Sequence, residues 1–234
     1  MGFAILAFVS FAGTALLFAH HNSESERLKR LLRTASVREL AAAADGAMVR
    51  IVGTTYTQSA QSRVLRGPIT GRSCLMYIVT VEYTYSSGDS FAWKQLIRET
   101  NEVPFLLRDA TGIAIVDPTA AITTLKFDHE RESAFHLLQP LEREFLAKHG
   151  HTSEGQLANK LLRYREAIVE AGGSITVLGI GVREPDPDGT PAEGYRSAAP
   201  TRMRFTSSPK HPLVISDDPT TTRSAPKQLP PSTS

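Results

Sequence analysis

The residues 103–118, VPFLLRDATGIAIVDP, constrain the fold more than any other part of this sequence. An apolar run leads into turn-forming residues and then into β-branched residues, which is the pattern of a β-hairpin. Asp109 can accept a hydrogen bond from the backbone two residues on, and Gly112 can take the positive φ that a tight turn needs. Pro118 cannot donate to a strand ladder, so the second strand should end just before it.

Several other segments have the composition and alternation of strands. Residues 86–89 read as a turn between two antiparallel strands, and Gly179 and Gly181 indicate a bend or a close backbone approach. Residues 157–170 fit either a helix or extended chain. The predicted strands cover residues 48–56, 74–85, 91–98, 174–182, 203–206 and 212–216.

One helical segment interrupts the strands. Apolar residues at Phe135, Leu138, Leu141 and Phe145 have helical spacing, and Pro140 predicts a break between two short helices within residues 127–148. The order of elements predicts an α+β fold that is mainly β. We expect an OB-like, partly open antiparallel β-barrel with an inserted helix, because closing a sheet removes its exposed edges.

The N-terminus predicts a membrane anchor. Residues 2–19 carry no charge, and 18 residues at about 1.5 Å each reach about 27 Å, enough for the hydrocarbon core. No basic residue precedes this run and no small-residue cleavage site follows it, so a secretory signal is not favoured. We therefore predict a transmembrane helix at residues 1–20. The basic residues that follow place the N-terminus outside and the globular domain in the cytoplasm, as a single-pass protein.

Residues 21–45 predict a basic juxtamembrane helix or linker. Leu28, Leu31 and Leu32 fall on one side of a helix, and Ser36 with Glu39 fits a capping box that begins a second turn. The helix should end near Asp45. Its basic face either contacts anionic lipid or is an ordinary solvated face. The β-rich domain then spans residues 46–216, and the Pro-, Ser- and Thr-rich residues 217–234 predict a disordered tail.

Composition excludes some functions. With 26 Lys and Arg against 24 Asp and Glu, the net charge of +2 is too small for a strong whole-protein field, so nucleic acid is not expected as a partner. A single cysteine, Cys74, excludes an intrachain disulfide and any zinc site built on several thiolates. Trp93 is expected in the core or at the barrel mouth.

Candidate catalytic groups have simpler structural explanations. Asp109 and Asp117 frame the hairpin as a turn former and a strand terminator, rather than as an acid–base pair. Cys74 begins a strand and reads as a small buried residue. The histidines give no convergent metal set, so we predict no catalytic residue, metal or cofactor; the histidines considered are His129, His136, His149 and His151.

The best candidate for a contact surface is a loop rich in arginine. Arg63, Arg66 and Arg72 surround the Gly67–Gly71 segment, GPITG, which could offer a concave basic surface to an anion or to a partner's acidic segment. The spacing differs from that of a phosphate-binding P-loop.

Three segments together resemble the beside-a-membrane domain, also called the GIDE domain, of membrane-anchored RING-type E3 ubiquitin ligases. They are GPITGRSCLMYIVTVE at 67–82, PFLLRDATGIAIVDP at 104–118 and RYREAIVEAGGSITVLG at 163–179; HPLVISD at 211–217 is similar to the segment before the second membrane helix of such proteins. The resemblance implies ubiquitin transfer, but a RING needs about eight Cys and His ligands, and this sequence shows neither a RING nor a second membrane helix.

The sequence thus favours a single-pass membrane-anchored, GIDE-like module that presents a protein- or lipid-contact surface without a reaction of its own. The alternative is a component of E3 ubiquitin transferase activity that would need a RING in trans. A third reading is oligonucleotide binding through the OB-like face, which the near-neutral charge weakens. The protein partner and the oligomeric state stay open.

Overall fold

Strands are the commonest regular element in this computed structural model, which describes residues 26–59, 61–87, 90–152, 155–157, 159–187, 189 and 200–222. The mainly β class predicted from alternating patterns is therefore confirmed. The strands are β1 (Ala47–Tyr56), β2 (Leu65–Arg66), β3 (Ser73–Cys74), β4 (Met76–Ser87), β5 (Ser90–Glu102), β6 (Phe105–Arg108), β7 (Ile113–Val116), β8 (Ile122–Thr124), β9 (His129–Ala134), β10 (Leu161–Val169), β11 (Ser174–Pro185), β12 (Thr201–Phe205) and β13 (Val214–Ser216). The helical elements are a helix over residues 26–34, the short turns η1 (Leu40–Ala42), η2 (Phe135–Leu137) and η3 (Gly155–Leu157), and α2 (Pro140–Lys148).

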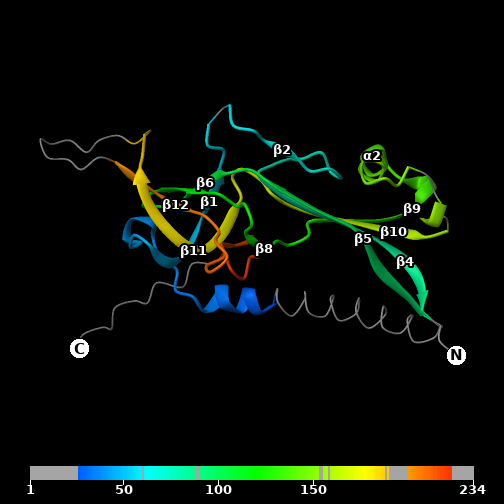
Figure 1. Ribbon diagram of the computed structural model, residues 1–234, viewed down its shortest axis with the longest axis horizontal. Coiled ribbons are helices and arrows are strands. Elements are labelled where there is room, and N and C mark those ends of the chain that lie inside the picture. The colour runs from blue at the N-terminus through cyan, green and yellow to red at the C-terminus, as the bar shows by residue number, and fades with distance from the viewer. Residues whose placement is uncertain are drawn as a thin grey trace, which may run out of the picture.

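Five strands close into a barrel at one end of the molecule (Figure 1). Their order is β1-β6-β7-β12-β11, and β11 pairs with β1 to complete the ring. The predicted β-barrel is present, but it is closed and not partly open, and one of its strand pairs is parallel. Strand direction cannot alternate all the way around a closed ring with an odd number of strands, and the parallel pair is β7 with β12. Strand β13 adds to β11, and β8 adds to β13.

The barrel closes tightly at the two glycines of β11. A Cβ atom on Gly179 would lie 2.5 Å from Leu213 Cδ1, and one on Gly181 would lie 2.7 Å from Met203 Cε. The sequence predicted a bend or a close backbone approach at these glycines, whereas the atoms that approach them most closely belong to side chains. Phe205, which pairs with Gly181, is fully buried and fills the interior beside it.

The predicted hairpin is present as β6 and β7, which pair from Phe105 with Val116 to Arg108 with Ile113. The carboxylate of Asp109 organises its turn, accepting hydrogen bonds from the N–H groups of Thr111 (2.7 Å) and Gly112 (2.9 Å). Gly112 does not have a positive φ, so that expectation is wrong. The side-chain bonds of Asp109 hold the turn in a conformation open to residues other than glycine.

A second, four-stranded antiparallel sheet lies beside the barrel, in the order β5-β4-β10-β9. Residues 157–170, for which the sequence fitted either a helix or extended chain, contain the strand β10. The helical prediction for residues 127–148 is half right. Pro140 is the first residue of α2, but residues 129–134 form β9 because they pair with β10 from Ala134–Leu161 to His129–Glu166.

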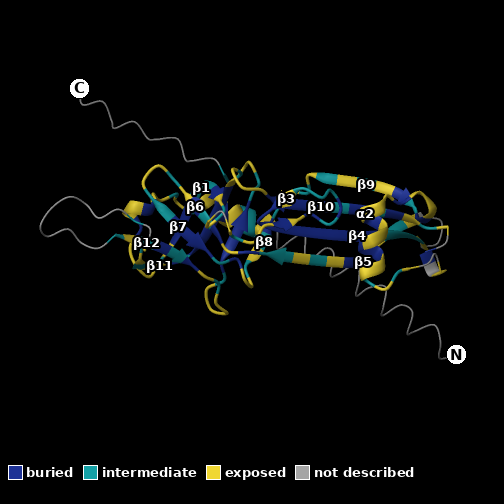
Figure 2. Cartoon of the chain, turned by 90° about the horizontal axis from the view of Figure 1, so that it is seen from above, coloured by how far each residue is buried: buried dark blue, intermediate teal, exposed yellow. Residues whose placement is uncertain are grey.

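Helix α2 lies over one face of this sheet, as Figure 2 shows from above. Its buried Phe145 and Leu146 belong to the same apolar cluster as Val81 of β4 and Leu162 of β10. That cluster continues into the barrel interior without a break. At the junction, Leu75 N–H donates to the Val169 carbonyl over 2.7 Å.

The helix over residues 26–34 packs on the outside of the barrel. Leu32 is completely buried against Leu178 and Val214. A helix continuing toward Asp45 is not observed, and Glu39 makes no side-chain cap. The helix ends just before Ala35, whose carbonyl accepts a hydrogen bond from Arg50 Nη1 (2.9 Å). The carbonyl of Arg50 accepts a hydrogen bond from the Arg38 N–H (2.8 Å), which holds the following segment on β1.

The predicted disordered tail is ordered over residues 217–222. Thr221 is fully buried, and its carbonyl accepts hydrogen bonds from Thr176 Oγ1 (2.7 Å) and from the Arg50 guanidinium. Asp217 accepts a 2.7 Å bond from Lys126 N–H. Hydrogen bonds to distant strands therefore hold a segment that lacks an apolar face.

Among the described residues, none of the helices combines the length and the apolar composition needed to span a bilayer. The predicted anchor, residues 1–20, falls outside the described residues, as does the remainder of the predicted tail, residues 223–234.

Candidate functional site

The predicted binding arginines surround the small hairpin of β2 and β3. Arg63 and Arg66 are exposed, and Arg66 Nη1 donates to the Gly71 carbonyl over 3.2 Å. Arg72 forms ion pairs with Asp128 and, at 3.4 Å, with Glu170. Arg72 is thus held by two carboxylates of its own chain. Arg63 and Arg66 are the cations of this loop that face solvent.

The loop between these strands does hold an anion, which is the carboxylate of Glu166. Its oxygens accept hydrogen bonds from Ile69 N–H (2.9 Å), from Thr70 N–H (3.3 Å) and from the Thr70 hydroxyl. A Cβ on Gly67 would lie 2.8 Å from Glu166 Oε2. Glu166 is completely buried, so this chain itself fills the concave side that the sequence suggested for an external anion.

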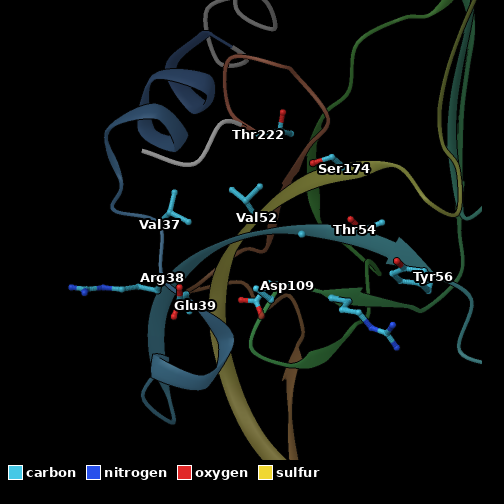
Figure 3. A pocket seen from close by; sticks show the side chains of 12 residues that line it. Val37, Arg38, Glu39, Val52, Thr54, Tyr56, Asp109, Ser174 and Thr222 are labelled. Atoms are coloured by element: carbon cyan, nitrogen blue, oxygen red, sulfur yellow. The ribbon is translucent and has the colours of Figure 1, made fainter. Parts of the chain in front are cut away.

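A polar groove of about 480 Å³ runs along β1 and the β6–β7 turn (Figure 3). The Arg108 guanidinium lies 5.0 Å from the Tyr56 ring centre at one end. Asp109 Oδ2 accepts a 2.7 Å bond from Leu40 N–H, while its other oxygen holds the turn.

Asp117, at the end of β7, accepts a 3.1 Å bond from Thr119 N–H. Both aspartates have the structural roles that the sequence analysis gave them.

Three side chains of reactive types, Cys74, Lys148 and His149, are buried or paired with a carboxylate. Burial, helped by the nearby charges of Glu166 and Glu170, raises the pKa of Cys74 to about 12, so the thiol stays protonated. His149 Nε2 lies 2.8 Å from Glu99 Oε2, and Lys148 Nζ lies 2.8 Å from the same carboxylate. These contacts fix the end of α2 on β5. The described residues contain no group of three or more side chains that could hold a metal ion.

Trp93 lies on β5, outside the barrel, so its predicted position is wrong. It is half-buried, and the Arg163 guanidinium lies 4.2 Å from its ring centre. Arg163 in turn donates a 2.8 Å bond to the completely buried Glu82. One face of the indole is therefore covered by a cation that is itself anchored.

The helix over residues 26–34 has one fixed side and one free basic side. Lys29 reaches the C-terminal segment, with its Nζ 3.2 Å from Asp218 Oδ2. Arg27, Arg30 and Arg33 are exposed. Because Leu32 and Lys29 hold the helix to the barrel, these three arginines have a defined position on the molecule.

An apolar groove of about 470 Å³ lies between this helix and the outer face of the barrel. Leu31 and Met48 are each 49% exposed at this groove, although both are large apolar residues. The sequence analysis did not predict this groove; the signal was the three leucines on one side of the helix, of which Leu28 and Leu32 pack on the barrel while Leu31 stays exposed. The lining residues are Leu28, Leu31, Ala35, Ser36, Arg38, Met48, Val49, Arg50, Ile122, Leu178, Pro212 and Val214.

No protein-family model, curated protein or solved structure matches this chain. The class of protein is therefore described by its architecture: a closed five-stranded barrel, an attached antiparallel sheet, and a basic helix docked on the barrel wall.

Proposed function

We propose that this protein is a membrane-anchored module that presents a lipid-contact surface and performs no reaction of its own. The observation that carries this proposal is the docking of the helix over residues 26–34 on the barrel. Complete burial of Leu32 makes helix and barrel one unit immediately after the predicted anchor at residues 1–20. In this proposal the N-terminus is outside and the barrel is cytoplasmic, as the basic residues favour.

The exposed side of the helix suits an anionic bilayer. Arg27, Arg30 and Arg33 are exposed together, and each basic residue near such a surface contributes about 1 kcal/mol. Leu31 and Met48 add exposed apolar area next to them. This combination of cations and apolar side chains is typical of segments that lie on membranes.

The polar groups that could perform chemistry support a non-catalytic role. Glu166, Asp109 and Glu99 use their carboxylates to fix loops and helix ends, and the Cys74 thiol is held protonated. A catalytic group needs a free atom aimed at a substrate.

We also propose that the barrel is of the OB type. Along the chain the barrel strands are β1, β6, β7, β11 and β12, and around the ring their order is first, second, third, fifth, fourth. The third strand, β7, and the fifth, β12, are parallel, as in an OB-fold. Oligonucleotide binding is not favoured. On β6 and β7, the second and third strands of the barrel, no outward position has an aromatic side chain that could stack on a base. These positions are Leu106, Arg108, Ile113 and Ile115.

The GIDE-domain resemblance stays a prediction, and so does the alternative of ubiquitin transfer with a RING supplied in trans. Autoubiquitination would be measured with a charged conjugating enzyme, and no product above that of a RING-free control would reject this alternative.

The lipid-contact proposal is tested with the full chain in vesicles. Trp93 is the sole tryptophan, so energy transfer from it to a headgroup acceptor reports the distance of the sheet from the bilayer. We expect more transfer with phosphatidylserine than with phosphatidylcholine alone, and less at high salt. Replacing Arg27, Arg30 and Arg33 by Glu should remove the phosphatidylserine increment.

A matched control places the same charge change on Arg63, Arg66 and Lys94, which are exposed elsewhere. If this control loses the increment while the helix variant keeps it, the contact surface includes Arg63, Arg66 or Lys94 and the helix assignment fails. Alkaline extraction tests the anchor separately: release of the chain from the vesicles would contradict it.

A further inference from the structure

Arg50 is a buried cation without an anionic partner among the described residues. Its side chain starts from β1, and only 4% of the residue is exposed. Its two terminal nitrogens donate to the carbonyls of Ala35 and Thr221, whereas its Nε is buried without a partner. Burial lowers the pKa of its guanidinium, and no neighbouring carboxylate offsets this effect. A charge in such a site is costly unless an anion approaches it.

Arg50 lines the apolar groove described above, together with Arg38. The described lining residues include no carboxylate, and most are aliphatic. At about 470 Å³, the groove falls in the size range of small-molecule sites, about 300–1,000 Å³. An apolar groove with two cations complements a ligand that has one alkyl chain and one negative head.

We propose that this groove binds a single-chain amphiphile with an anionic head, such as a fatty-acid carboxylate, whose charge is compensated by Arg50. The alkyl chain packs against Leu31, Met48 and Leu178, which covers the apolar area that is exposed at the groove. The inference goes beyond the surface contact proposed above, and it holds whether or not Arg27, Arg30 and Arg33 bind a bilayer.

The test uses the full chain in phosphatidylcholine vesicles with two photoactivatable probes of equal chain length. One probe is dodecanoate and the other is dodecyltrimethylammonium, each carrying a diazirine. Mass spectrometry then locates the labelled residues. We expect the segments 28–38 and 47–50 to be labelled about tenfold more by the carboxylate than by the ammonium. Leu31→Glu, which puts a carboxylate at an exposed position of the groove, should reduce this labelling about tenfold.

Leu137→Glu is the matched control, because Leu137 is 62% exposed on η2, outside the groove lining, and it should leave labelling unchanged. Arg50→Gln should abolish the preference for the carboxylate. If Arg50→Gln unfolds the chain, the comparison of Leu31→Glu with Leu137→Glu decides the question. Equal labelling by the two probes, labelling confined to other segments, or no effect of Leu31→Glu would overturn the proposal.

Discussion

The carboxylate of Glu166 accepts a 2.9 Å hydrogen bond from the backbone N–H of Ile69, so an anion from β10 fills the loop between β2 and β3. Glu166→Ala leaves the buried N–H groups of this loop without their acceptor. We expect the free energy of unfolding to fall by about 2–4 kcal/mol, as measured by denaturant titration.

Glu132→Ala is the comparison, since Glu132 is exposed on β9, and it should change stability by less than about 0.5 kcal/mol. Similar losses for the two variants would show that Glu166 does not organise the loop.

Asp217 makes stability depend on pH. Burial, together with the charges of Asp128 and Asp218, raises the pKa of its carboxyl from 3.8 to about 6. Between these values the unfolded chain releases the proton while the folded chain keeps it, so the contribution of Asp217 to stability falls as pH rises. Asp217→Asn should therefore stabilise the protein by about 1–2 kcal/mol at pH 7, with little effect near pH 4. Denaturant titrations across this range measure the difference, and a gain that is independent of pH would contradict the assignment.

Substitutions of the neighbouring residues Leu31 and Leu32 distinguish the buried contact that holds the helix from its exposed surface. Leu32→Ala removes a completely buried side chain, whereas Leu31 is 49% exposed. We expect Leu32→Ala to cost about 2–4 kcal/mol and to speed amide hydrogen exchange over residues 26–34. Leu31→Ala should cost less than about 1 kcal/mol. Equal exchange in the two variants would mean that the helix is not held through Leu32.

Alanine substitutions at Gly112 and Gly181 should have opposite effects on stability. A Cβ on Gly112 would lie 3.6 Å from Leu40 Cβ, an ordinary contact, so Gly112→Ala should be neutral or stabilising by up to about 1 kcal/mol. A Cβ on Gly181 would lie 2.7 Å from Met203 Cε and 3.0 Å from Phe205 Cε1. Gly181→Ala should therefore cost about 1–3 kcal/mol in thermal or denaturant unfolding. A destabilising Gly112→Ala would show that its turn needs glycine after all.

Local patterns predicted the elements whose determinants are local. The β6–β7 hairpin carries its turn signal in Asp109, and β1, β4 and β11 have long β-branched runs. Strand β9 was misread because its polar sequence has no strand period, and only its pairing with β10 makes it extended. The ordered residues 217–222 have no apolar face, so their attachment to Arg50 and Thr176 could not be inferred from composition.

The candidate sites show the same limit. The Gly67–Gly71 loop was predicted to face an external anion through its arginines, and sequence spacing could not reveal that Glu166, 97 positions from Ile69, lies in the loop and is bound by its backbone. The apolar groove was not predicted because it is formed by five separate parts of the chain: the first helix with the residues that follow it, β1, β8, β11 and the segment that contains Pro212 and Val214. A surface shared by distant segments has no sequence motif of its own.

The four-stranded sheet is built from two excursions of the barrel chain: β4 and β5 between β1 and β6, and β9 with β10 between β7 and β11. The two excursions join through the pairing of β4 with β10, which runs from Met76–Val169 to Tyr83–Leu162. Each excursion therefore covers one edge of the other, and shortening one of them would leave the other with an unpaired edge.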